Sequence, residues 1–152
     1  MEFTEYDGLK LLPPFDEDDE PAPELAVAHW RDAIARADAM LFATPEYNSS
    51  IPGQLKNAVD WASRPVKEAV LRNKPVAVIG ASTGMFGAVW AQAELRKVLS
   101  SAGARVIDRE LPIATVHESF ETDGTIKDND VVLELDGILV ELLHSAQQKR
   151  VA

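Results

Sequence analysis

Hydrophobic residues along the chain alternate between short continuous runs and longer stretches with helical spacing. Three runs, residues 39–43, 75–80 and 104–108, are mostly apolar and lie next to turn-forming residues, as expected for strands buried on both faces of a sheet. The opening segment, residues 2–7, is short and polar, which favours a strand at the edge of that sheet. The runs therefore predict a sheet built mainly of buried strands.

Between these runs, apolar residues recur three and four positions apart, so that one side of each stretch would face a core. Pro52 falls in the first turn of the second stretch, where a missing N–H costs little. Gly103 ends the third stretch, as a glycine at the C-terminus of a helix does. In the last stretch, Thr125 and Asp128 have capping-box spacing. The four predicted helices cover residues 24–37, 52–63, 88–102 and 125–147.

The alternation of strands and helices predicts a single α/β domain over residues 1–152. Parallel strands joined by helices give right-handed crossovers and a three-layer sandwich. In such sheets, ligands bind in the loops that follow the carboxyl ends of the strands. The order of elements thus directs the search for a site to the loops after residues 39–43 and 75–80.

Those two loops are ATPEYNSSIPG (residues 43–53) and GASTGMFG (residues 80–87). Each leads into a predicted helix, whose N-terminus offers unpaired N–H groups and a partial positive charge. The glycines of the second loop would let its backbone approach a flat ligand, but their spacing matches neither the dinucleotide fingerprint nor the phosphate loop. Each loop alone could be an ordinary strand–helix turn, with Tyr47 covering the core. Together they favour a binding site.

Composition narrows the classes of partner. A formal charge of −10 argues against nucleic acid, because that binding depends on neutralising phosphates. No run approaches the ~18 apolar residues of a membrane span, and no secretory signal is readable. With no cysteine in the chain, we expect a cytoplasmic protein without membrane contact. The acidic run at residues 16–20 lacks the spacing of a calcium loop and is interpreted as solvated.

Two motifs resemble the NADPH-dependent FMN reductase family. T-P-E-Y-N-x-S-I-P-G-x-L-K-N-A-x-D-W spans residues 44–61, and K-P-V-A-V-I-G-A-S-x-G spans residues 74–84. The resemblance extends from about Glu2 to the last helix and implies a flavodoxin-like fold with FMN as cofactor. It also implies ping-pong transfer from NADPH or NADH to a small-molecule acceptor such as a quinone, azo dye, flavin or metal oxyanion, in a homodimer or homotetramer.

The resemblance further implies that two segments hold the flavin ring, one along it and one closing its other side. Backbone N–H groups of the second segment would stabilise the electron-rich edge of the ring. No side-chain general base is needed, because the cofactor carries the chemistry, and no catalytic side chain is assigned. The implied cofactor-binding residues are Pro45, Glu46, Tyr47, Asn48, Ala81, Ser82, Thr83 and Gly84.

Several other residues have competing interpretations. Arg64 matches a family arginine near the ring and the subunit contact, but it could also be a surface cation. Glu46 could be taken for a general acid, although a backbone-positioning or interface role fits better. Because the protein is acidic, capture of an anionic substrate would depend on local cations such as Lys56, Arg64 and Arg96. His117 could lie at the edge of the pocket, and the three histidines show no metal-ligand spacing.

One part of the family pattern has no counterpart here. The family normally opens with a central strand and a loop, G-S-x-R-x-x-S-x-N, that holds the FMN phosphate. This sequence begins at what resembles the second strand, so it holds the ring half of the site and lacks both the phosphate half and the first central strand. Three explanations are open: a misassigned start or truncated chain, a second chain that supplies the strand or covers the gap, or a divergent, flavin-free relative.

Three functions follow from these alternatives. The leading one is an FMN-dependent NAD(P)H oxidoreductase. The second is a non-catalytic or truncated flavodoxin-like module with impaired FMN binding, because losing the phosphate donors should weaken binding by several kcal/mol. The third is a flavin-carrying electron-transfer protein.

Overall fold

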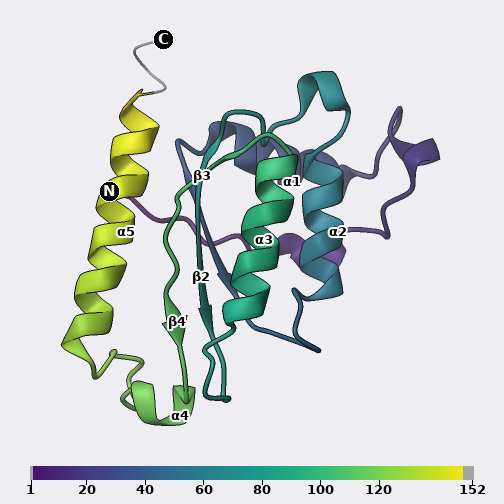
Figure 1. Ribbon diagram of the computed structural model, residues 1–152. Helices are drawn as coiled ribbons and strands as arrows, with labels where there is room; N and C mark the ends of the chain where they lie inside the picture. The colour runs from purple at the N-terminus through teal and green to yellow at the C-terminus, as the bar shows by residue number, and fades with distance from the viewer. Residues whose placement is uncertain (1, 149–152) are drawn as a thin grey trace.

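The computed structural model describes residues 2–148 and contains a parallel sheet with β2 at its centre (Figure 1). The outer strand β1 follows one edge of β2 in a register that pairs Met40 with Val76 and Thr44 with Gly80. Two short strands, β3 and β4, share the other edge of β2, one near its start and one near its end. The strands are β1 (Met40–Thr44), β2 (Pro75–Ala81), β3 (Arg105–Val106) and β4 (Pro112–Ile113).

Four long helices cover the two faces of this sheet, which confirms the predicted three layers (Figure 1). On one face lie α1 (Leu25–Arg36), α2 (Gly53–Ala62) and α3 (Val89–Ser101), and on the other lies α5 (Asn129–Gln148). The shorter helices are α4 (Val116–Ser119) and the 3-10 turns η1 (Gly8–Leu11), η2 (Glu17–Asp19) and η3 (Val66–Glu68). Within residues 2–148, no helix is both long and apolar enough to cross a membrane.

The alternation of side chains along β2 divides the core between the two layers of helices. Val76 and Val78 pack on the α1–α3 side with fully buried leucines of α3. Ala77 points to the opposite side and packs in a separate cluster with Ile138 and Leu142 of α5. Since successive residues of a strand face opposite ways, the continuous apolar run predicted as a doubly covered strand is explained.

The last helix begins four residues later than predicted. The backbone N–H of Thr125 donates to Asp123 Oδ1 (2.9 Å), so Thr125 belongs to a turn. Asp128 instead accepts from the N–H of Asp130 (2.8 Å), which satisfies one of the unpaired donors at the start of α5.

Residues 2–7 do not form the predicted edge strand. They make no strand pairing in the described part of the chain. A strand needs an adjacent edge, and the central strand expected between this segment and β1 is not among the described residues. The segment instead packs on the helices, with Tyr6 against Trp30 (4.7 Å between ring centroids).

The strand predicted at residues 104–108 is shorter than expected and is continued by β4. The seven residues from Val106 to Pro112 lie opposite only five residues of β2, from Val76 to Gly80. The segment therefore carries an insertion of two residues, and within it Arg96 binds both Asp108 (3.1 Å) and Glu110 (2.9 Å). This insertion breaks the apolar alternation by which a strand is recognised.

The second half of the first motif holds the fold together. Asn57 donates to Pro13 O (2.9 Å) and accepts from the N–H of Phe15 (2.7 Å). Trp61 is fully buried and its indole N–H also donates to Pro13 O (2.8 Å). These bonds tie the segment before α1 to α2, so this part of the motif is structural.

Candidate functional site

The two predicted loops emerge side by side at the carboxyl edge of the sheet. Thr44 and Gly80, the residues at which β1 and β2 give way to these loops, are paired in the strand register. An apolar cavity of about 330 Å³ opens beside them, so the protein's own side chains do not fill the gap. Of the residues predicted to bind the ring, Pro45 and Ala81 line it. Its other walls are Ala43, Thr44, Ile79, Gly80, Ile113, Phe120, Ile126 and Leu135.

A tight turn projects Tyr47 away from the core. Tyr47 and Ser50 exchange two backbone hydrogen bonds of 3.0 Å each. Between them, Asn48 (φ 52°) and Ser49 (φ 59°) are both left-handed, as in the type I′ turns that favour asparagine. Tyr47 is 63% exposed. The alternative in which Tyr47 covers the core is therefore wrong.

Glu46 connects the first loop to helix α3. Its Oε2 accepts a hydrogen bond from the backbone N–H of Ala91 (3.0 Å), in the first turn of α3. Ser50 Oγ adds a second link by donating to Glu94 Oε2 (2.5 Å). The carboxylate of Glu46 thus acts as an N-terminal cap and positions the loop.

Two of the three N–H groups expected to face the ring edge, those of Ser82, Thr83 and Gly84, are unused. The N–H of Ser82 donates to Ile113 O (3.0 Å), and Gly84 O accepts from Thr115 N–H (3.0 Å). The N–H groups of Thr83 and Gly84 meet no acceptor within residues 2–148. Of the N–H groups expected to face the ring edge, that of Ser82 is therefore engaged, and those of Thr83 and Gly84 can bind a ligand oxygen or nitrogen.

The glycines of this loop have different surroundings. A Cβ on Gly84 would meet only Ser82 Oγ, at 3.8 Å, so the space above it is open. Gly87 has φ +58°, and a Cβ there would lie 2.5 Å from the backbone carbon of Pro112. Gly84 leaves room for a ligand, whereas Gly87 is required by close backbone packing.

A fully buried glutamine fixes the second loop to its neighbours. Gln92 Nε2 donates to Gly87 O (3.1 Å), and Gln92 Oε1 accepts from Leu111 N–H (3.0 Å). Gly80 makes room for this side chain, because a Cβ there would lie 2.9 Å from Gln92 Nε2. The loop is thus held rigidly at the end of β2.

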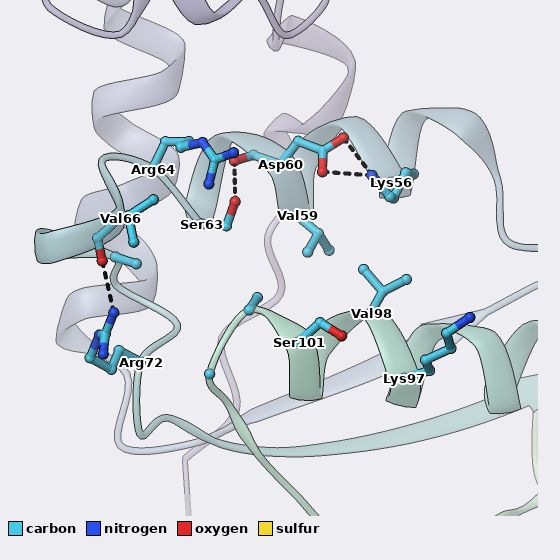
Figure 2. A pocket seen from close by; sticks show the side chains of 13 residues that line it. Lys56, Val59, Asp60, Ser63, Arg64, Val66, Arg72, Lys97, Val98 and Ser101 are labelled. Carbon is cyan, nitrogen blue, oxygen red and sulfur yellow. Dashed lines mark hydrogen bonds and ion pairs between the residues drawn. The ribbon is translucent and has the colours of Figure 1, made fainter.

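The cations expected to attract an anionic substrate are engaged elsewhere. Lys56 pairs with Asp60 (2.6 Å) and Arg64 with Glu20 (3.1 Å), while Arg96 binds the two carboxylates described above. Figure 2 shows Lys56 and Arg64 in a separate groove of about 460 Å³ between α2 and α3. None of the three lines the cavity beside the loops, so the expectation that they serve it is not supported.

His117 does not reach the cavity. It lies on α4 with its side chain 64% exposed, beside Glu118. The cavity wall near α4 is instead apolar and formed by Phe120 and Ile126. Within residues 2–148, no group of three or more His, Asp or Glu side chains is placed to hold a metal ion.

No sequence motif indicated the far wall of the cavity. Phe120 and Ile126 pair with each other in an isolated antiparallel bridge, and Leu135 comes from α5. Helical spacing predicts that Leu135 lies on the buried face of its helix, and it gives no sign of a cavity there. Its role in the cavity depends on how α5 crosses the end of the sheet, which a one-dimensional pattern cannot show.

Comparison with known proteins agrees with this geometry. A model of the NADPH-dependent FMN reductase family matches residues 1–118. The chain belongs to this family. It is 45% identical over 105 residues to an NAD(P)H-dependent FMN reductase of Pseudomonas aeruginosa, covering 68% of this chain and 56% of that one. It is 40% identical over 132 residues to a 2-hydroxy-1,4-benzoquinone reductase of a Burkholderia species, covering 86% and 70%.

A solved structure shares the fold. FerB, a flavoenzyme NAD(P)H:acceptor oxidoreductase from Paracoccus denitrificans, superposes with a TM-score of 0.79 at 34% identity, over 92% of this chain and 78% of that one. The flavodoxin-like fold is thereby confirmed. The chain spans little more than half the length of the Pseudomonas aeruginosa relative, and 48% of a Pseudomonas putida quinone reductase.

The described residues fit the ring of FMN. An apolar cavity, two unused N–H donors and open space above Gly84 suit a flat ligand with one polar edge. Pro45 and Ala81 would border the ring, and Thr83 and Gly84 would donate to its edge. The phosphate is a different case, because the sequence contains no segment that matches the family's phosphate loop.

Proposed function

We propose that this chain is the ring-binding part of an FMN-dependent NAD(P)H oxidoreductase that reduces small acceptors such as quinones. The observation that supports this most is the pairing of Thr44 with Gly80, which brings the two loops together beside an open apolar cavity. Relatives named as FMN, quinone and flavin reductases support the same activity.

Bound FMN would supply the redox chemistry, taking a hydride from NAD(P)H and passing two electrons to the acceptor. The protein's part is to orient the ring and to stabilise negative charge at its edge. Thr83 and Gly84 would donate their N–H groups to that edge from an anchored loop, because Ser82 N–H and Gly84 O are already bonded to the segment around β4. Fixed donors of this kind avoid the cost of reorganisation.

The proposal is tested by adding FMN to the purified chain and following oxidation of NADH and NADPH with a quinone as acceptor. We expect saturable FMN binding and quinone-dependent turnover with ping-pong kinetics. A folded sample that binds no flavin at high FMN concentration contradicts the proposal. Binding without NAD(P)H turnover would identify an electron-transfer protein instead.

The second candidate, a module with impaired FMN binding, is supported by the open edge of β1. That strand pairs only with β2 among the described residues, and an open edge of an apolar strand ordinarily needs cover. A partner or a further segment could provide this cover.

Two further expectations have simple tests. Light scattering combined with gel filtration would test the predicted homodimer or homotetramer. Fractionation of cells would test the predicted cytoplasmic location.

A further inference from the structure

Three large side chains at the start of α3 are exposed without a structural reason. Met85 is 74%, Phe86 55% and Trp90 47% exposed. Phe86 and Trp90 contact each other nearly edge to face, with ring centroids 5.0 Å apart and planes at 60°. Aromatic side chains are rarely left together in water on a monomer unless something binds there.

This aromatic pair lies beside the first loop of the candidate site. Trp90 precedes Ala91, whose N–H is held by Glu46. It lies one turn before Glu94, which binds Ser50, and residues four apart share one face of a helix. Trp90 therefore faces the same loop that carries Pro45 and Tyr47, and Phe86 adjoins the second loop.

The charges around the pair select the kind of ligand. One turn after Trp90, on the same face of α3, lies the acidic side chain of Glu94. The next cation on the face is Lys97, seven residues on and about 10 Å farther along the axis, where it lines the groove of Figure 2. With a net charge of −10 on the chain, an anionic ligand would be repelled here and an uncharged one would not.

We propose that Phe86 and Trp90 form an aromatic platform that binds a flat, uncharged aromatic electron acceptor and disfavours anionic ones. That the ligand is an electron acceptor rests on the proposed function, but its binding to the platform does not. The platform would hold the acceptor next to the ring site and thus set acceptor specificity, a role that neither motif indicates.

Binding can be measured without flavin, because tryptophan emission reports on the platform. The chain has three tryptophans. Trp30 and Trp61 are 4% and 0% exposed, so Trp90 is the one that a ligand in solvent can reach. Titration with 1,4-naphthoquinone should quench a solvent-exposed emission in a saturable manner. The Trp90→Phe variant, which keeps an aromatic ring, should lose most of this quenching.

Matched variants and ligands separate specific binding from collision. We expect Phe86→Ala to weaken naphthoquinone binding about threefold, the size of one lost aromatic contact. Leu133→Ala, at an even more exposed apolar position on α5 (67%), should leave binding unchanged. The analogue 1,4-naphthoquinone-2-sulfonate has the same ring and one negative charge, and it should bind at least about fivefold more weakly.

Three results would overturn the proposal. The first is quenching that never saturates and is the same in Phe86→Ala. The second is equal affinity for the sulfonated and the neutral quinone. The third is a Trp90 emission typical of a buried tryptophan that changes with protein concentration, which would make the pair a contact between copies of the chain.

A turnover experiment separates this inference from the proposed function. In Trp90→Ala, KM for naphthoquinone should rise about fivefold, whereas in Leu133→Ala both this KM and the rate at which NADH reduces FMN should stay unchanged. Absence of any FMN reduction would contradict the proposed function alone, because the flavin-free titration would still decide whether the platform binds. An unchanged KM in an active enzyme would contradict the platform alone.

Discussion

Helix α3 begins without a cap from its own flanking residue. Its N-cap, Ala88, is left-handed (φ 60°) and has no side-chain acceptor. Glu46, which lies 45 positions before Ala91, supplies one to the N–H of Ala91. We expect Glu46→Ala to lower the free energy of unfolding by about 1–2 kcal/mol, because it removes a cap and a favourable charge at a helix N-terminus. Urea denaturation measures this.

The matched control is Glu24→Ala. Glu24 is the N-cap of α1 but makes no side-chain hydrogen bond there, so its loss should change stability by less than about 0.5 kcal/mol. Equal effects of the two substitutions would show that Glu46 does not cap α3.

Gly87 is a second residue whose role depends on its surroundings. Its backbone is left-handed, and an added methyl group would overlap the backbone of Pro112 and Ile113. Gly87→Ala should therefore destabilise the protein by at least about 2 kcal/mol. A thermal shift no larger than that of Gly84→Ala would contradict this account. In the sequence the two glycines look alike, and only the approach of β4 distinguishes them.

At the scale of elements, periodicity predicted the long helices and the two long strands well. β2 and the helices α2 and α3 each bury a continuous stripe, which is the signal that sequence analysis uses. β3 and β4 pair over two residues each, too few for a pattern. Residues 2–7 read as a strand in isolation, but a strand forms only against a neighbour.

The anchoring of residues 13–15 to α2 gives a prediction at this scale. Asn57→Ala removes two hydrogen bonds that are the principal polar link between these elements. We expect stability to fall by about 2 kcal/mol and the amide of Phe15 to exchange its hydrogen faster, as measured by hydrogen–deuterium exchange. Gln54→Ala, which removes one exposed bond to Leu9 O, serves as the control. Unchanged exchange at Phe15 would contradict the anchoring role.

At the scale of the whole molecule, the site combines parts that the sequence could and could not indicate. The eight predicted ring-binding residues lie in two loops that the strand register brings together. The far wall of the cavity comes from α5 and residues 120–126, whose placement depends on packing across the sheet. The aromatic pair of Phe86 and Trp90 went unnoticed because two isolated aromatic residues form no motif.

The composition of the site also predicts which part of a flavin matters. In the proposed site, Pro45, Ala81, Thr83 and Gly84 would hold the ring, and no segment of the sequence matches the family's phosphate loop. Riboflavin, which has the ring without the phosphate, should therefore bind this chain within about threefold of FMN, since no phosphate contact separates them. Isothermal titration of both flavins tests this, and FMN binding a hundredfold tighter would reveal a phosphate site.

The central claim is that the loops beginning at Pro45 and Ala81 grip a flat ring, and titration of riboflavin into three proteins tests it most directly. Gly84→Ala and Gly53→Ala both add a methyl group in space that the protein leaves open, so neither should lower stability. We predict that Gly84→Ala weakens riboflavin binding at least about fivefold, because its methyl group occupies the position of the ring. Gly53→Ala should bind like the wild type. Undetectable binding to the folded wild-type chain, or equal affinity in all three proteins, would contradict the claim.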